Sequence, residues 1–118
     1  MIRVGIIGLG FMGRMHYGVY DKLPDARVVA VSDSDPKRAA GDLSDGWGNV
    51  SGAEIDRLPM DRIRGTTDWR ELITWNEVDM VDICLPTPAH SEVIGAALSA
   101  GKHVLCEKPL AGSSAEAR

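Results

Sequence analysis

The sequence predicts a single α/β domain built on a doubly wound, mainly parallel β-sheet. Short apolar runs rich in β-branched residues alternate along the 118 residues with segments of helical period, which is the pattern of repeated β-α-β units. The first run, Ile2–Ile7, is apolar almost throughout, as expected for a strand that helices cover on both faces. A chain of this length has room for one core, and its 44% hydrophobic and 25% charged residues are ordinary for a globular protein.

Three elements are expected after the opening strand. A helix is predicted over Phe11–Leu23 and is stopped by Pro24, and Arg27–Ser32 is the second strand. Asp35 and Pro36 then have the residue types of a helix N-cap and first turn. Glycines and turn residues interrupt the pattern from residue 41 to 65, where we expect a short helix, a loop insertion and a brief strand near 63–66.

The second half of the chain repeats the alternation. Asp68 is expected to cap a short helix through Ile73, with Glu71 at the capping-box position. A strand over Val78–Leu85, a helix over Ala89–Ala100 ended by a left-handed Gly101, and a buried strand over His103–Cys106 follow in that order. Ser113 and Glu116 have capping-box spacing, and the sequence stops about one turn later, so residues 1–118 are expected to be a domain cut just after this point.

Composition excludes several classes of function. A net charge of −4 and the lack of a basic patch argue against a nucleic-acid partner, and no apolar run approaches membrane-spanning length. Cys84 and Cys106 lie in expected central strands and are not at metal-ligand spacing, so we expect buried thiols, no disulfide and no metal. A cytoplasmic protein is the simplest interpretation.

The segment from Gly8 to Gly13 fits the pattern G-x-G-x-x-G. It directly follows a buried strand and opens a helix, which is the context of a dinucleotide-binding (Rossmann) turn. Gly8 would allow the tight turn, Gly10 the approach of a pyrophosphate, and Gly13 close helix–strand packing. The pyrophosphate would then lie on backbone N–H groups around Phe11 and Met12 at the positive end of the helix dipole.

Asp33 closes the second expected strand, 20 residues after Gly13. A carboxylate there is placed to accept hydrogen bonds from the adenosine ribose and would repel a 2′-phosphate, so NAD is favoured, with NADP as the alternative. Ser34 and Arg38 are neighbouring candidates for cofactor binding, and nearby cations soften the preference. The other interpretation of Asp33 is a polar residue in a turn.

Four segments together resemble the Gfo/Idh/MocA oxidoreductase family, which includes glucose–fructose oxidoreductase and inositol 2-dehydrogenase. They are the glycine turn at residues 8–13, the strand end V-S-D-S-D-P at 31–36, L-P-T-P-A-H at 85–90, and A-G-K-H-V-L-C-E-K-P-L-A at 100–111. The last segment is the most specific of the four. The resemblance implies an N-terminal NAD(P)-binding Rossmann domain over residues 1–118, and a further α/β substrate domain that this sequence lacks.

By the same resemblance, Lys108 contacts the cofactor and the reacting substrate oxygen and is the expected catalytic residue, while Glu107 helps to position Lys108 and the cofactor ribose. An ammonium group near that oxygen suits hydride transfer, because it stabilises or relays charge as the proton leaves. Read without the resemblance, the two residues are an ordinary surface ion pair.

The resemblance also assigns Leu85, Pro86, Thr87 and His90 to the adenosine and ribose side of the cofactor. The family often has Thr-Pro-Asn where this chain has Leu-Pro-Thr, while His90 keeps the histidine position. His90 is equally compatible with a structural role at a helix start. Five further residues are expected to be structural or at the surface: His16, His103, Trp47, Trp69 and Trp75.

The predicted parent protein is a nicotinamide-dependent oxidoreductase acting on a hydroxyl/ketone pair of a sugar, cyclitol or related polyol, and is expected to be a homo-oligomer. The 118 residues alone are expected to bind cofactor with little turnover. Two other classes remain open at this point: a non-catalytic nucleotide-sensing module that regulates a partner, and an S-adenosylmethionine-dependent methyltransferase, in which the E-K-P segment has no evident purpose.

Overall fold

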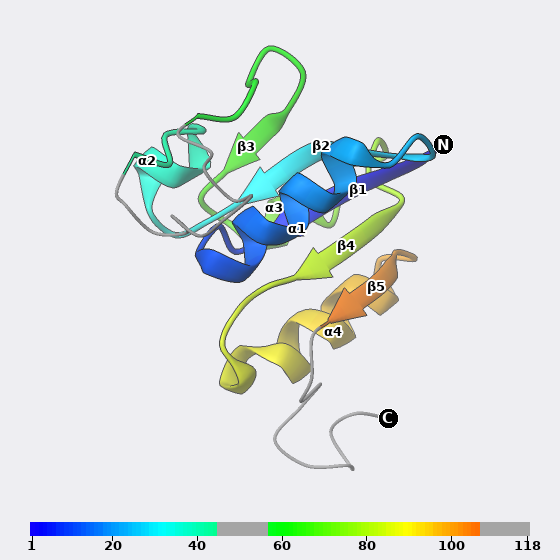
Figure 1. Ribbon diagram of the computed structural model, residues 1–118. Helices are drawn as coiled ribbons and strands as arrows, with labels where there is room; N and C mark the ends of the chain where they lie inside the picture. Colours follow the sequence, from blue (N-terminus) through cyan, green and yellow to red (C-terminus); the bar gives the residue numbers. More distant parts are fainter. Residues whose placement is uncertain (45–56, 107–118) are drawn as a thin grey trace.

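The computed structural model describes residues 1–44 and 57–106, and it contains one parallel sheet of the predicted kind (Figure 1). The strands lie in the order β3-β2-β1-β4-β5, and each neighbouring pair is parallel. Their bounds are β1 Ile2–Ile7, β2 Ala26–Ser32, β3 Arg64–Thr66, β4 Met80–Ile83 and β5 His103–Cys106. The chain therefore runs outward from β1 in one direction and returns to continue in the other, as a doubly wound sheet does.

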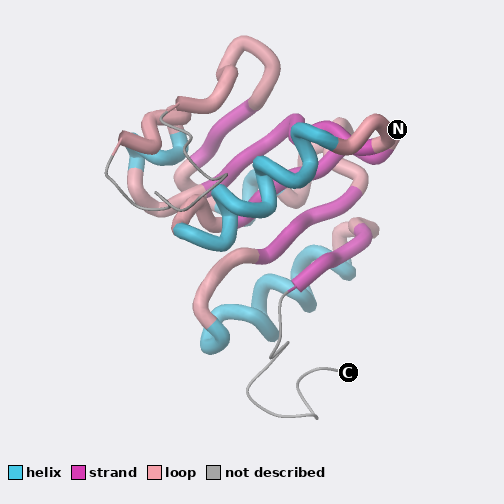
Figure 2. Tube along the Cα trace, viewed as in Figure 1, coloured by secondary structure: helices cyan, strands magenta, loops and turns pink. Residues whose placement is uncertain are grey.

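Helices cover both faces of this sheet (Figure 2). The helix α1 (Phe11–Lys22) packs Tyr17 and Tyr20 into one core, with Val4 and Ile6 of β1. The helices α3 (Trp69–Leu72) and α4 (His90–Ser99) build a second core on Val81 and Ile83 of β4. Two separate apolar cores explain why β1 is apolar almost throughout, whereas β4 has one buried polar residue, Asp82, among its apolar ones.

The local start and stop signals were predicted well. The helix α1 ends at Lys22, and Leu23 is its C-cap with extended backbone. In α2 (Pro36–Ala39), Asp35 is the N-cap, and its side chain accepts a hydrogen bond from the backbone N–H of Lys37 at 2.9 Å. Gly101 follows α4 with φ +80°, the left-handed conformation expected of a glycine that ends a helix.

The predicted capping box at the start of α3 is wrong in its second half. The Asp68 side chain does cap the helix, accepting from the backbone N–H of Arg70 at 3.0 Å. However, the N–H of Asp68 donates to Oγ1 of Thr66 at 3.1 Å, and Glu71 accepts from that same hydroxyl at 3.3 Å. Thr66, at the end of β3, thus stands between the two residues that the sequence pattern paired directly.

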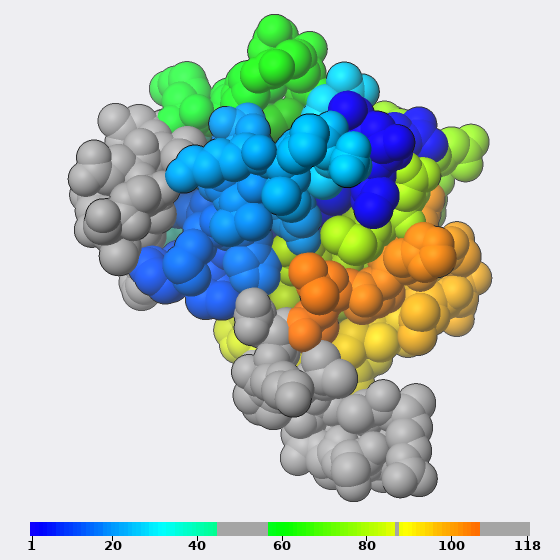
Figure 3. All heavy atoms as spheres, turned by 45° about the vertical axis from the view of Figure 1, so that its right-hand side comes forward, coloured from blue at the N-terminus to red at the C-terminus, as the bar shows by residue number. Residues whose placement is uncertain are grey.

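The last strand is another correction, because β5 is not buried. His103 and Leu105 are exposed, Leu105 with 46% of its surface, and β5 pairs only with β4 among the described strands. Figure 3 shows this strand, in orange, at the molecular surface. Cys84 and Cys106 are accordingly half-buried thiols rather than buried ones, and neither forms a disulfide. An apolar run of four residues does not distinguish a central strand from an edge strand.

Several predictions differ only in extent or lie outside the described residues. β4 is shorter than predicted, and a 3₁₀ turn, η1 (Thr87–Ala89), precedes α4. Residues 41–44 and 57–63 contain no further helix, only a bridge between Asp42 and Arg57. Some predictions lie outside the described residues: the loop insertion at 45–56, Trp47, Glu107, Lys108 and the Ser113 capping box. Within the described ranges, no helix has the length and apolarity to cross a bilayer.

Candidate dinucleotide-binding site

The candidate site lies at the carboxyl ends of β1 and β4. At this point the order of strands reverses, because the chain adds β2 and β3 on one side of β1 and β4 and β5 on the other. β1 pairs with β2 on one side and with β4 on the other, and both β1 and β4 lead into loops at this edge. Ligands of open α/β sheets bind at such a point. The loop after β1 is the glycine turn of residues 8–13, and the loop after β4 contains residues 84–89.

Two glycines make close packing of the turn possible. Gly8 has φ +101°, and a Cβ added to it would lie 2.7 Å from the carbonyl oxygen of Cys84. A Cβ added to Gly13 would lie 1.9 Å from the carbonyl oxygen of Gly8. Since both neighbours are backbone atoms, neither position has room for a side chain. The turn is therefore held against β4 on one side and against its own helix on the other.

Gly10 differs from the other two, because a Cβ added there would meet no atom of residues 1–44 or 57–106 within 4 Å. Gly10 is the N-cap of α1. Because glycine has no side chain, it makes no capping hydrogen bond to the backbone N–H groups of the first helical turn. Phe11 and Met12 are partly exposed at this helix start. Open space above exposed backbone at a helix N-terminus fits the diphosphate of a dinucleotide.

Asp33 points at this turn from the end of β2. Its Oδ2 accepts a hydrogen bond from the backbone N–H of Leu9 at 2.8 Å, and its Oδ1 accepts from the N–H of Asp35 at 2.9 Å. A carboxylate has about four lone-pair positions, so capacity for the hydroxyl groups of a ribose remains. Asp33 thus holds the turn in place as well as lining it, a role that the spacing alone did not predict.

The two other candidates from this part of the chain lie close to Asp33. Nη1 of Arg38 is 3.8 Å from Oδ2 of Asp33, and the Arg38 side chain is 20% exposed. Ser34 is exposed at the start of the same loop. The structure therefore groups the predicted residues of β1 and β2 around one edge, with a carboxylate and a guanidinium side by side.

The loop after β4 covers Gly8, as the predicted site requires. Cδ2 of Leu85 lies 3.1 Å from the position of a Gly8 Cβ, and Pro86 is exposed beside it. Thr87 begins the 3₁₀ turn η1. His90 is only 4% exposed, and its Nε2 donates to the carbonyl oxygen of Leu85 at 2.5 Å. This hydrogen bond from the His90 ring holds the loop after β4 in place. A direct contact between His90 and the cofactor stays a prediction.

Arg14 is a residue of this region that the sequence analysis missed. It is fully buried, and its guanidinium donates to the carbonyl oxygens of Leu9 at 2.9 Å and Leu43 at 3.1 Å. These bonds connect the glycine turn to the chain that follows α2. A signal was present, because Arg14 lies three residues before Tyr17 and six before Tyr20, on the buried face of α1.

A doubly wound parallel sheet whose first strand ends in an open glycine turn defines a dinucleotide-binding Rossmann domain. A family model described as "Oxidoreductase family, NAD-binding Rossmann fold" matches residues 2–118, and the chain belongs to this Gfo/Idh/MocA family. The resemblance seen in the sequence is thereby confirmed, and NAD is the cofactor of the family's domain.

Individual relatives agree with this assignment. The chain is 39% identical to an inositol 2-dehydrogenase of Rubrobacter xylanophilus over 118 residues, which are 99% of this chain and 30% of that protein. An NAD-binding oxidoreductase from Klebsiella pneumoniae superposes with a TM-score of 0.74 at 35% identity, over 98% of this chain and 29% of the other.

A levoglucosan dehydrogenase in complex with NADH and levoglucosan superposes with a TM-score of 0.75 at 32% identity, over 98% of this chain and 30% of the other. The chain thus spans about 30% of the length of the relatives it matches.

Proposed function

We propose that this chain is the cofactor-binding part of a dehydrogenase that transfers hydride between NAD(H) and a hydroxyl/ketone pair of a sugar, cyclitol or related polyol. Relatives named for inositol and levoglucosan support this substrate class. The observation that carries the proposal is the open backbone at Gly10, with the Asp33 carboxylate bonded to the same turn. The matched family favours an oxidoreductase over the sensing module and the methyltransferase.

The same geometry supports a preference for NAD over NADP. The Asp33 carboxylate would accept hydrogen bonds from both ribose hydroxyls, and its negative charge would repel a 2′-phosphate. Arg38 offers a positive charge at 3.8 Å from that carboxylate, which lowers the repulsion without removing it. We expect the chain to bind both dinucleotides, with NADH the tighter.

The test is a fluorescence titration of this chain with NADH and with NADPH, repeated on Asp33→Asn. Asparagine keeps one oxygen that can accept from the N–H of Leu9, so the bond to the turn is retained. It removes the charge and, because an amide nitrogen does not accept, also the exposed hydrogen bond from the N–H of Asp35. The affinity for NADH should fall by about tenfold, roughly 1.4 kcal/mol, and that for NADPH should fall less or rise. Asp33→Ala should also weaken NADH more than NADPH.

Asp35→Asn is the matched control, because Asp35 is an exposed neighbour and asparagine is an equally good N-cap. Its affinity for both dinucleotides should match that of the unchanged chain. Equal losses for NADH and NADPH in Asp33→Asn would remove Asp33 from the ribose site. If the unchanged chain binds neither dinucleotide, the proposed function itself is wrong.

Lys108 is the proposed catalytic residue of the complete protein, with Glu107 positioning it. Both follow β5 directly, and Cys106, the last described residue of that strand, is the register partner of Ile83 at the end of β4. In a protein that includes the substrate domain, Lys108→Ala should reduce kcat by at least about 100-fold and leave NADH affinity nearly unchanged.

Lys22→Ala, at the exposed end of α1, is the control for loss of a lysine and should retain full turnover. Normal kcat in Lys108→Ala would exclude Lys108 from the reaction.

We also propose that the 118 residues alone bind cofactor with little turnover, that the complete protein is a homo-oligomer, and that it works in the cytoplasm. Steady-state kinetics and light scattering on the complete protein and on this chain test the first two.

A further inference from the structure

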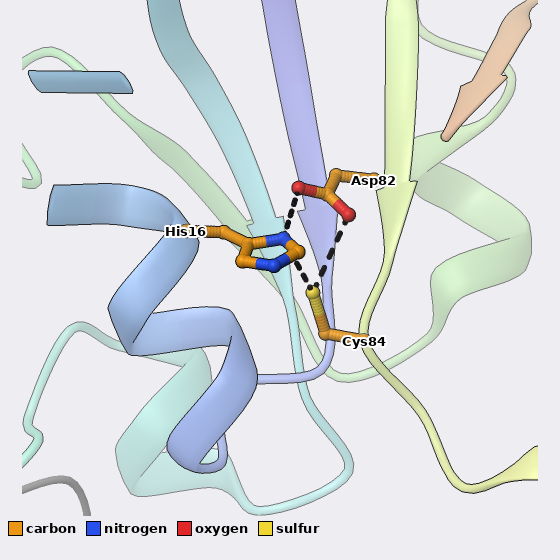
Figure 4. A group of neighbouring side chains, drawn as sticks. All are labelled: His16, Asp82 and Cys84. Atoms are coloured by element: carbon orange, nitrogen blue, oxygen red, sulfur yellow. Dashed lines mark hydrogen bonds and ion pairs between the residues drawn. The ribbon is translucent and has the colours of Figure 1, made fainter. Parts of the chain in front are cut away.

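A group of polar side chains lies beneath the glycine turn, between α1 and β4 (Figure 4). Asp82 of β4 is fully buried, and its Oδ2 accepts from Nδ1 of His16 at 2.6 Å. Sγ of Cys84 lies 3.4 Å from Oδ1 of the same carboxylate and 3.5 Å from Nδ1 of His16. We call His16, Asp82 and Cys84 the α1–β4 cluster. None of these three side chains was assigned a role in the proposed dinucleotide site, where Cys84 contributes only its backbone carbonyl beside Gly8.

The three side chains are ligands that transition metals of the zinc class favour. Imidazole nitrogen, carboxylate oxygen and cysteine thiolate are the common protein ligands of Zn²⁺. One ligand atom from each residue lies within 4.8 Å of the others. Neighbouring ligands at the corners of a tetrahedron around zinc are roughly 3.3–3.5 Å apart, given bond lengths of about 2.0 Å to nitrogen and oxygen and 2.3 Å to sulfur. The two distances from Sγ of Cys84 have these values, whereas Nδ1 of His16 lies 2.6 Å from Oδ2 of Asp82, a hydrogen bond that must open for the metal to enter.

The charges also balance. A buried charge must be paired or must coordinate a metal, and Asp82 has none of its surface exposed. A divalent cation with one carboxylate, one thiolate and a neutral imidazole forms a set with no net charge. Binding would release the thiol proton to solvent and would need the imidazole proton on Nε2. The hydrogen bond between Nδ1 of His16 and Oδ2 of Asp82 and the contact between Sγ of Cys84 and Oδ1 would both be replaced by bonds to the metal.

Tyr20 decides which carboxylate oxygen faces the metal. Its hydroxyl donates to Oδ2 of Asp82 at 2.7 Å and comes from the same helix as His16, one turn further along. Oδ2 therefore accepts from both Tyr20 and Nδ1 of His16, while Oδ1 faces Cys84. When a metal takes Nδ1 of His16, the hydrogen bond from Tyr20 still holds Oδ2. A fixed hydrogen bond of this kind orients a carboxylate ligand and strengthens metal binding.

We propose that Nδ1 of His16, Oδ1 of Asp82 and Sγ of Cys84 bind one divalent transition-metal ion of the zinc class, with solvent at its remaining position. The His16 side chain is 13% exposed, so the site has access to solvent. From the sequence we expected no metal, because Cys84 and Cys106 are not at metal-ligand spacing. The proposed site instead combines a ligand from α1 with ligands at β4 and directly after it, and these elements are far apart in the sequence. The metal would tie the helix behind the glycine turn to the centre of the sheet.

The test is a titration of the reduced chain with Co²⁺, which replaces zinc and is coloured. Binding should produce a thiolate-to-cobalt charge-transfer band and visible bands of tetrahedral strength, and one equivalent of Zn²⁺ should remove both. Cys84→Ser should abolish the charge-transfer band, and His16→Gln should weaken Co²⁺ binding at least about tenfold. Cys106→Ser is the matched control and should leave the spectrum unchanged, since Cys106 packs in the other core.

Tyr20→Phe separates a metal site from a merely structural network. The charge-transfer band should remain, because the three ligands are intact, while the affinity for Co²⁺ should fall about tenfold or more. Circular dichroism on each variant shows that the fold is retained. The proposal is overturned if the unchanged chain shows no charge-transfer band, if Co²⁺ binds without one, or if Cys106→Ser removes it.

Discussion

The two ends of the sheet use polar groups in opposite ways. At the amino ends, Arg3 and Asp79 bind one another: Nε and Nη2 of Arg3 donate to the carboxylate at 3.1 Å, and the Arg3 backbone N–H donates at 2.9 Å. Nearby, Lys102 donates to the carbonyl oxygens of Trp75 and Val78 at 2.7 and 2.6 Å. At the carboxyl ends, the turn at Gly10 instead presents open backbone.

The difference teaches where to look for function in such a sheet. Both ends carry carboxylates and cations, so residue type alone does not separate them. At the amino ends the charged groups hold β1, β4 and the chain before β5 together. At the carboxyl ends, Asp33 is fixed by the N–H groups of Leu9 and Asp35, and its oxygens keep capacity for a ligand. Substitutions at the two ends should therefore affect different measurements.

Gly13→Ala should have the largest effect, and the effect is on folding. The new Cβ would lie 1.9 Å from the carbonyl oxygen of Gly8, and a backbone atom in a packed turn has little room to move. The free energy of unfolding should fall by about 3 kcal/mol or more. Urea denaturation followed by circular dichroism measures it. A loss below about 1 kcal/mol would mean that the turn is looser than the structure shows.

Gly10→Ala should separate binding from folding at the same turn. In the part of the chain that the structure describes, no atom lies within 4 Å of the new methyl group, so the free energy of unfolding should change by less than about 1 kcal/mol. The methyl group would occupy the space proposed for the diphosphate. NADH affinity should therefore fall at least about tenfold, or about 1.4 kcal/mol, in the fluorescence titration.

Gly95→Ala is the control for that substitution. Gly95 also has open space around it, but it lies within α4, away from the turn. Alanine there should raise the free energy of unfolding by about 0.5–1 kcal/mol and leave NADH affinity unchanged. If Gly10→Ala binds NADH as tightly as Gly95→Ala does, the diphosphate does not lie over Gly10.

The sequence predicted those features that short segments determine by themselves. The bounds of β1, the cap at Asp35 and the stop at Gly101 each depend on a few neighbouring residues, and the structure has them as predicted. The glycine pattern likewise predicted the tight turn at Gly8, which has φ +101°, and the close packing at Gly13.

The features that were missed depend on residues far apart in the chain. Arg14 is buried because Leu43 and Leu9 accept its hydrogen bonds, and His16 meets Asp82 only after β4 has joined the sheet. The exposure of β5 depends on which strands lie beside it. The helical period of α1 indicates that Arg14 faces inward, but no periodic signal identifies the partner of Arg14 or of His16, or the neighbours of β5, so these pairings need the folded chain.

The amino end of the sheet gives the smallest expected effect, and it depends on pH. The guanidinium and backbone N–H of Arg3 lower the pKa of Asp79 to about 2, from an ordinary value of 3.8. Because the folded-state pKa is lowered, this carboxylate stabilises the fold above about pH 4, and that contribution is lost as the pH falls through 2. Asp79→Asn should be slightly less stable than the unchanged chain at pH 7, and the two stabilities should converge between pH 4 and pH 2. Urea denaturation across this range measures the convergence, and a difference that stays constant with pH would contradict it. NADH affinity at pH 7 should be the same for both, because Asp79 lies at the opposite end of β4 from the glycine turn.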